Sequence, residues 1–269
     1  MTASDAPEND LLTLVPAIHS GIEDAAELVH WLVRGVDTVL RELPPELVGG
    51  VRQGVADLQR QFDDMIGRLR HALEQAGDPA ALRAAGTAWA NTIGGTASNL
   101  VGLAIEGSTR ADDSWKGLAA DAYRGALWPQ RLALTAVKTT GDAIDAALNE
   151  LARAIVEFWR DVEIALILLV LGLASAVAAA VSTAAGGPLT FPIAVVAAAA
   201  ALNAFGIALT NSMTMFSDLA NENSVRTAEL HRRLNDNSGF EGENWPNPTA
   251  ERYSDGSLTD GDDTGWHLK

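Results

Sequence analysis

The feature that most constrains this chain is the stretch 164–217, which contains no charged side chain. It holds two almost wholly apolar blocks, 164–181 and 192–209, separated by a Gly-Gly-Pro turn at 186–188. As an α-helix, each block would be about 27 Å long, close to the roughly 30 Å of a bilayer core. The stretch therefore predicts an apolar helical hairpin. Such a hairpin either contacts a membrane or is buried among the other helices.

Small residues such as Gly172 and Gly206 would allow the two helices of this hairpin to pack closely. If the hairpin enters a membrane, the chain is either a membrane-active, pore-forming protein or a protein anchored by two spans, and its partner is a lipid bilayer. The residues expected to form the hairpin are Ile164, Leu168, Leu171, Gly187, Pro188, Ile193 and Phe205.

The N-terminal part of the chain shows a helical pattern in two segments. Apolar residues spaced alternately by four and three predict helices over 16–43 and 47–76, after a flexible N-terminus at 1–15. Pro44-Pro45 ends the first helix, so the two helices are expected to form an antiparallel pair over 16–76.

A second helical hairpin is predicted over 77–162. Gly77-Asp78-Pro79 combines a C-cap glycine, an N-cap aspartate and a proline for the first helical position. Helices are expected over 78–106 and 118–162. The second one carries a heptad seam that either binds a partner helix or forms an internal core. The residues of this seam are Ile144, Leu148, Leu151, Ile155 and Phe158.

The remaining segments complete an all-α architecture of long antiparallel helical hairpins forming a bundle. Residues 163–235 are expected to hold the apolar hairpin and an amphipathic helix. Residues 236–269 are rich in Asn, Gly, Pro, Ser and acidic residues, which predicts a disordered acidic tail.

Composition excludes several classes of function. A formal net charge of −16 argues against nucleic acid as a partner, and the absence of Cys excludes thiolate metal sites. The five His residues are scattered, and no motif of a nucleotide, metal or nucleophile site is found. The chain is therefore predicted to be non-enzymatic, with no catalytic residues, no metal, no cofactor and no small-molecule substrate.

A Trp-Lys-Gly tripeptide at 115–117 lies between the two helices of the second hairpin. The first helix opens with Asp-Pro-Ala-Ala-Leu at 78–82 and contains Trp89, and Ala-Ala-Asp-Ala-Tyr follows the turn at 119–123. This arrangement resembles the WXG family of helical hairpins of type VII (ESX) secretion, as an enlarged actinobacterial member. The resemblance covers roughly 77–161. Its turn motif corresponds to Trp115, Gly117 and Tyr123.

The resemblance implies a component or substrate of a type VII secretion system that acts through helix–helix pairing. Its partner would be a second WXG-like helical protein or another copy of itself. The chain would be secreted without a Sec signal peptide or associated with the cell envelope, after a cytoplasmic pool. One departure is that Tyr123 and Tyr253 are followed four places on by Leu127 and Ser257, not by the acidic residue of the family's export motif. Either a partner supplies the signal, or the chain is not itself exported.

Overall fold

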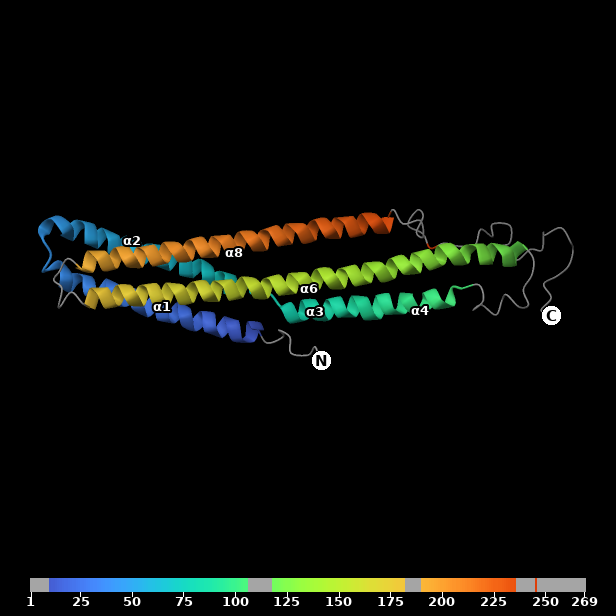
Figure 1. Cartoon of the computed structure of the whole chain (residues 1–269), viewed down its shortest axis with the longest axis horizontal. Helices are drawn as coiled ribbons and strands as arrows, with labels where there is room; N and C mark the ends of the chain where they lie inside the picture. Colours follow the sequence, from blue (N-terminus) through green and yellow to red (C-terminus); the bar gives the residue numbers. More distant parts are fainter. Residues whose placement is uncertain (1–9, 106–117, 182–189, 236–244, 246–269) are drawn as a thin grey trace. The chain divides into compact units, whose positions relative to one another are not determined.

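The computed structural model describes residues 10–105, 118–181, 190–235 and Trp245 (Figure 1). All secondary structure in these residues is helical, which confirms the all-α class. The Trp-Lys-Gly turn, the Gly-Gly-Pro turn and, apart from Trp245, the acidic tail at 236–269 lie outside the described residues.

The N-terminal helices form the expected pair. Helix α1 spans Asp10–Leu40 and helix α2 spans Pro45–Leu73. The amides of Glu42 and Leu47 donate hydrogen bonds to the carbonyls of Val39 and Pro44 in the turn between them. The expectation of a flexible segment at 1–15 is wrong for residues 10–15, which belong to α1. The physical reason is that Leu14 extends the apolar stripe of α1 by one turn and is buried.

The first arm of the second hairpin is a helix interrupted by a π-helical segment. It consists of α3 (Pro79–Ala88), η1 (Trp89–Gly94) and α4 (Gly95–Leu103). Gly77, predicted as a C-cap, has a φ of 86°, a left-handed conformation that favours glycine. Pro79 occupies the first position of α3, where its missing N–H costs no helical hydrogen bond.

The two long helices contribute to two compact units. Helix α6 (Leu118–Val181) continues without a break through position 162, and α8 spans Thr190–Asn235. Unit 1 comprises 1–79 and 153–220, and unit 2 comprises 80–152 and 221–269. The apolar hairpin predicted from the sequence therefore belongs to unit 1, together with α1 and α2.

Unit 1 places the α1–α2 pair against the apolar hairpin formed by α6 and α8. Glycines mark the closest approaches. A Cβ built on Gly21 of α1 would lie 2.7 Å from Leu166 Cδ2 of α6, and one on Gly54 of α2 would lie 3.3 Å from Val195 Cγ1 of α8. Within the hairpin, a Cβ on Gly172 would lie 2.6 Å from Ala201 Cβ, as the small-residue pattern predicted.

The core of unit 1 is contributed by all four helices and consists of aliphatic and aromatic side chains. None of the buried side chains in the described residues is polar or charged. The largest fully buried side chains of this unit are Ile18, Ile22, Leu32, Leu58, Leu69, Val162, Leu166, Leu169, Leu173, Phe191 and Leu202.

Trp159 fastens the end of the α1–α2 pair to α6. Its indole Nε1–H donates a hydrogen bond of 2.9 Å to the carbonyl of Ala76, just beyond the end of α2. Its ring is buried, and it meets the ring of Phe158 edge-on at a centroid distance of 4.9 Å. Phe158 in turn lies 5.6 Å from the ring of Phe216 on α8. This cluster joins α2, α6 and α8 within unit 1.

We expect Trp159→Phe to lower the free energy of unfolding by about 1 kcal/mol, because the Ala76 carbonyl loses its donor while most of the aromatic packing remains. Trp128→Phe is the control, since Trp128 is 64% exposed and its replacement should change stability little. Urea denaturation followed by far-UV circular dichroism measures both. Equal stability of the two variants would show that the Trp159 hydrogen bond contributes nothing.

Candidate interaction surfaces

The outward side of the apolar hairpin in unit 1 is exposed and apolar. On α6 the exposed side chains recur at helical spacing, and Leu168 is 63% exposed. On α8 the corresponding side chains include Ile207, also 63% exposed. We call this surface the outer face of the hairpin. It consists of Ile164, Ile167, Leu168, Leu171, Val181, Ile193, Val196 and Ile207.

Two hydroxyl groups on the described part of the hairpin donate hydrogen bonds within their own helices. Ser175 Oγ donates to the carbonyl of Leu171 at 2.8 Å, and Thr210 Oγ1 donates to the carbonyl of Gly206 at 2.8 Å. An apolar environment penalises polar groups without partners, so this internal bonding lowers the cost of surrounding the helices with hydrocarbon.

The outward sides of α1 and α2 are polar. Glu23, Glu27 and Arg34 are exposed on α1, and Arg60 and Asp64 are exposed on α2. Unit 1 is thus two-sided, with a charged surface on the α1–α2 pair and an uncharged apolar surface on the hairpin. Large contiguous apolar surfaces are uncommon on monomeric soluble proteins and mark interaction sites.

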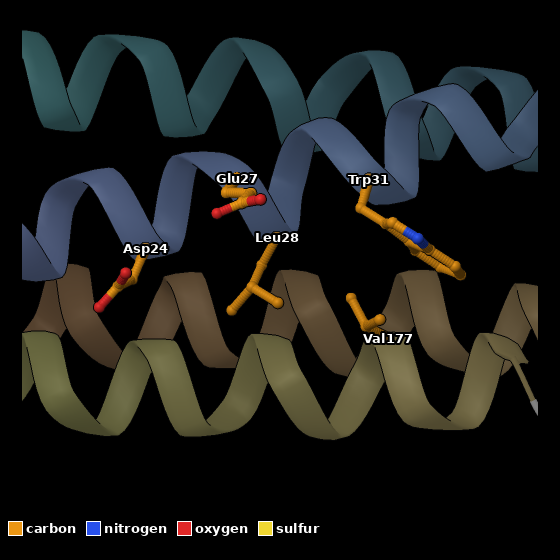
Figure 2. A pocket seen from close by; sticks show the side chains of 5 residues that line it. All are labelled: Asp24, Glu27, Leu28, Trp31 and Val177. Atoms are coloured by element: carbon orange, nitrogen blue, oxygen red, sulfur yellow. The ribbon is translucent and has the colours of Figure 1, made fainter.

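A shallow groove lies between α1 and α6 in unit 1. Figure 2 shows Leu28 and Val177 between the two helices, with the carboxylate of Asp24 to one side and Trp31 to the other. Glu27 also lines the groove. The groove combines acidic and apolar groups, but no group of three His, Asp or Glu side chains that could hold a metal ion lies anywhere in the described residues.

In unit 2 the two arms of the second hairpin approach closely at glycines. A Cβ built on Gly86 would lie 2.6 Å from Asp145 Oδ1 and 3.1 Å from Asp145 Cα. A Cβ on Gly141 of α6 would lie 3.1 Å from the carbonyl oxygen of Trp89 and 3.4 Å from Gly94 Cα. The π-helical segment η1 therefore lies where the backbones of the two arms meet. The π-helix was not predicted from the sequence.

The first arm of unit 2 carries an exposed apolar stripe. Trp89, Ile93, Leu100 and Leu103 follow one another at helical spacing and are all exposed, Leu103 by 63%. The side chains facing α6 are instead small, including Gly86, Gly94 and Ala97, which are buried. The large apolar residues of this arm are therefore partly exposed, Trp89 by 42% and Leu100 by 43%, whereas the small ones are buried. We call these four residues the outer stripe of unit 2.

The C-terminal part of α8 is tied to α6 in unit 2 by Arg226. Its guanidinium donates hydrogen bonds to Glu150 of α6 and, at 2.8 Å, to Glu222 Oε1. These bonds, the one to Glu150 first, raise the pKa of Arg226 above its ordinary value. Asn223 nearby is half-buried as a residue, but its amide Nδ2 and Oδ1 are buried and have no hydrogen-bond partner among the described residues. Such a group at an apolar position costs stability but favours one helix register.

The site residues predicted from the sequence lie in different environments. Trp115, Gly117, Gly187 and Pro188 lie outside the described residues, and Tyr123 is half-buried near the start of α6. The heptad seam divides between the two units. Ile144, Leu148 and Leu151 are half-buried in unit 2, whereas Ile155 and Phe158 pack inside unit 1.

The residues of the predicted apolar hairpin also differ in exposure. Ile164, Leu168, Leu171 and Ile193 lie on its outer face, and Phe205 is buried. Sequence reasoning missed the outer stripe of unit 2 as a surface, although its apolar spacing was visible. The signal that could have identified this surface is the small size of Gly86, Gly94 and Ala97, which are buried where the two arms come close together.

We expect Gly86→Ala to destabilise the protein by about 1–3 kcal/mol, because its Cβ would overlap the Asp145 carboxylate, which Asn149 Nδ2 holds at 2.8 Å. Gly102→Ala is the matched control on the same arm, since a Cβ there meets nothing within 4 Å. It should stabilise the helix by up to about 1 kcal/mol. Thermal unfolding measures the midpoint temperature of both variants. A shift of both midpoints in the same direction would contradict the packing described here.

No protein-family model, curated protein sequence or solved structure matches the chain.

Proposed function

We propose that this chain is a non-enzymatic helical protein that works with a type VII secretion system, as a component or a substrate, by pairing its second hairpin with a partner. The family resemblance of residues 77–161 motivates the class of system. The observation that carries the pairing is the outer stripe of unit 2, where Trp89, Ile93, Leu100 and Leu103 are exposed in helical register. Exposed apolar residues in such a row are the usual contact surface of a partner helix.

The partner that fits this stripe is a second helical hairpin, from a WXG-like protein or another copy of the chain. The arm that bears the stripe is poor in charge, with Arg83 as its one charged residue between Pro79 and Leu103. Pairing therefore rests on apolar packing and not on salt bridges. The proposal places the protein outside the cytoplasm after export, or at the cell envelope.

The test is to replace Leu100 and Leu103 by Lys. We expect the double variant to lose association with itself or with the small WXG-like helical proteins of its own cell, because charged groups at the centre of an apolar interface are left unpaired. Sedimentation velocity of the chain, alone and mixed with those proteins, measures the complex.

Asn91→Lys with Ser98→Lys is the matched control, because both side chains are exposed on the same arm but outside the stripe. It adds the same charge and should leave the complex intact. A complex that survives Leu100→Lys with Leu103→Lys, in a variant that keeps its helical circular dichroism, would exclude the stripe as the pairing surface.

A second candidate function is membrane association by unit 1. The outer face of the hairpin favours it, because this exposed apolar surface extends over two adjacent helices and contains no charge. Both helices are long and apolar enough to cross a membrane, although core helices of soluble proteins pass the same test. The hydroxyls bonded within their own helices suit a hydrocarbon environment.

We expect the chain to float with phosphatidylcholine vesicles in a density gradient, and Leu168→Lys with Ile207→Lys to abolish flotation. Each lysine in the hydrocarbon region costs about 2.5–3.5 kcal/mol. Thr38→Lys with Gln59→Lys adds the same charge on the exposed side of α1 and α2 and should float as well as the wild type. Wild-type protein that stays at the bottom of the gradient would rule out the membrane function.

A further inference from the structure

The apolar hairpin of unit 1 carries no charge around its circumference, and Ser175 and Asn203 are exposed polar residues on it. Its outer face is exposed, and its inner side packs against α1 and α2. This inner side is also free of polar groups, and its residues are Leu166, Leu169, Leu173, Ala176, Ala180, Ala194, Val195, Ala198 and Leu202. A helix that is apolar all round belongs either in the core of a large protein or in a membrane. Here one side is in a core and the other is exposed.

The α1–α2 pair has the opposite construction. Each helix is amphipathic, with a buried apolar stripe facing the hairpin and exposed charged residues such as Glu23, Arg34, Arg60 and Asp64. In the arrangement observed, unit 1 can rest its outer face on a bilayer. It cannot span the bilayer, because the charged sides of α1 and α2 would enter hydrocarbon with the hairpin.

The close contacts between the pair and the hairpin are of a kind that lipid can replace. Leu166 packs at Gly21, Val195 at Gly54 and Phe191 at Gly35, so each is an apolar side chain against a small residue. The hydrophobic effect holds these surfaces together in water. In a bilayer the acyl chains are as apolar as the helices, so that driving force disappears.

We propose that the inner side of the apolar hairpin is a second lipid-binding surface, and that the α1–α2 pair is a removable cover over it. On a membrane, acyl chains take the place of α1 and α2, and the hairpin inserts. The amphipathic pair then lies at the interface with its apolar stripe in the headgroup region and its charges in water. This inference rests on the membrane association proposed above.

The connection between α2 and α3 suits such a movement. It passes through Gly77, whose φ is 86°, and Trp159 holds the carbonyl of Ala76 at 2.9 Å. Trp159 lies just before the charge-free stretch begins, in the region where aromatic residues gather at membrane interfaces. The pair therefore separates from the hairpin while its end stays attached at this cluster.

The test exploits the absence of Cys in the chain. Gly54→Cys with Val195→Cys places a disulfide between α2 and α8 and fastens the cover to the hairpin. Gly172→Cys with Ala201→Cys is the matched control, because it joins α6 to α8 and leaves the cover free. A Cβ on Gly172 would lie 2.6 Å from Ala201 Cβ, so the two helices must separate slightly to reach the Cβ–Cβ distance of about 3.8 Å that a disulfide requires. Each oxidised variant and its reduced form is incubated with phosphatidylcholine vesicles. Flotation measures binding, and resistance to alkaline carbonate extraction measures insertion.

We expect oxidised Gly54→Cys with Val195→Cys to float but to be extracted by carbonate, and to resist extraction once reduced. Oxidised Gly172→Cys with Ala201→Cys should resist extraction in both forms. Equal resistance of the fastened and reduced forms would overturn the removable cover, as would wild-type protein that floats yet is fully extracted. Wild-type protein that does not float at all would refute membrane association itself, so the two failures are distinguishable.

Discussion

The structure of unit 1 depends on keeping the charge-free segment of α6 and α8 out of water. The amphipathic α1–α2 pair satisfies this constraint on one side of the hairpin only. Glycines at 21, 35 and 54 allow the two pairs to approach closely, and Trp159 fixes the end of α2 to α6. On the other side, residues such as Leu168 and Ile207 remain exposed. This uncovered surface is the main reason for proposing a membrane partner for the unit.

The two units present different kinds of exposed surface. Unit 2 is built on close backbone contact at Gly86, Gly94 and Gly141, which turns the large apolar residues of its first arm outward. That surface suits another helix, because it is a narrow row at helical spacing. The outer face of unit 1 is spread over two helices and lacks charge, which suits lipid. The proposed pairing and the proposed membrane contact therefore involve different surfaces, and substitutions can test them separately.

Local signals in the sequence predicted the helices well. Heptad spacing located α1 and α2, Pro44-Pro45 marked the turn between them, and Gly77 with Pro79 marked the start of α3. The composition of 164–217 identified the apolar hairpin, because the absence of charge and the high hydropathy of a segment can be read directly from its own residues. The apolar spacing placed the start of the first helix at residue 16, whereas α1 begins at Asp10 and buries Leu14.

The arrangement of the helices could not be predicted in the same way. Periodicity shows which face of a helix is apolar, but not what covers it. The bond between Trp159 and Ala76 joins residues 83 apart, and the division of the heptad seam between two units depends on such distant contacts. Likewise, the exposure of Trp89 and Leu100 depends on close contacts made by glycines on the neighbouring face of the arm. The propensities of single residues do not predict such contacts.

The most direct test of the membrane account is the environment of the outer face itself. A polarity-sensitive fluorophore is attached to single cysteines at Leu168, at Ile207 and, as a reference on the polar side, at Gln59. The account predicts that phosphatidylcholine vesicles shift the emission of the first two probes to the blue and leave the probe at Gln59 unchanged. Emission typical of water at Leu168 and Ile207 in the presence of vesicles would contradict it.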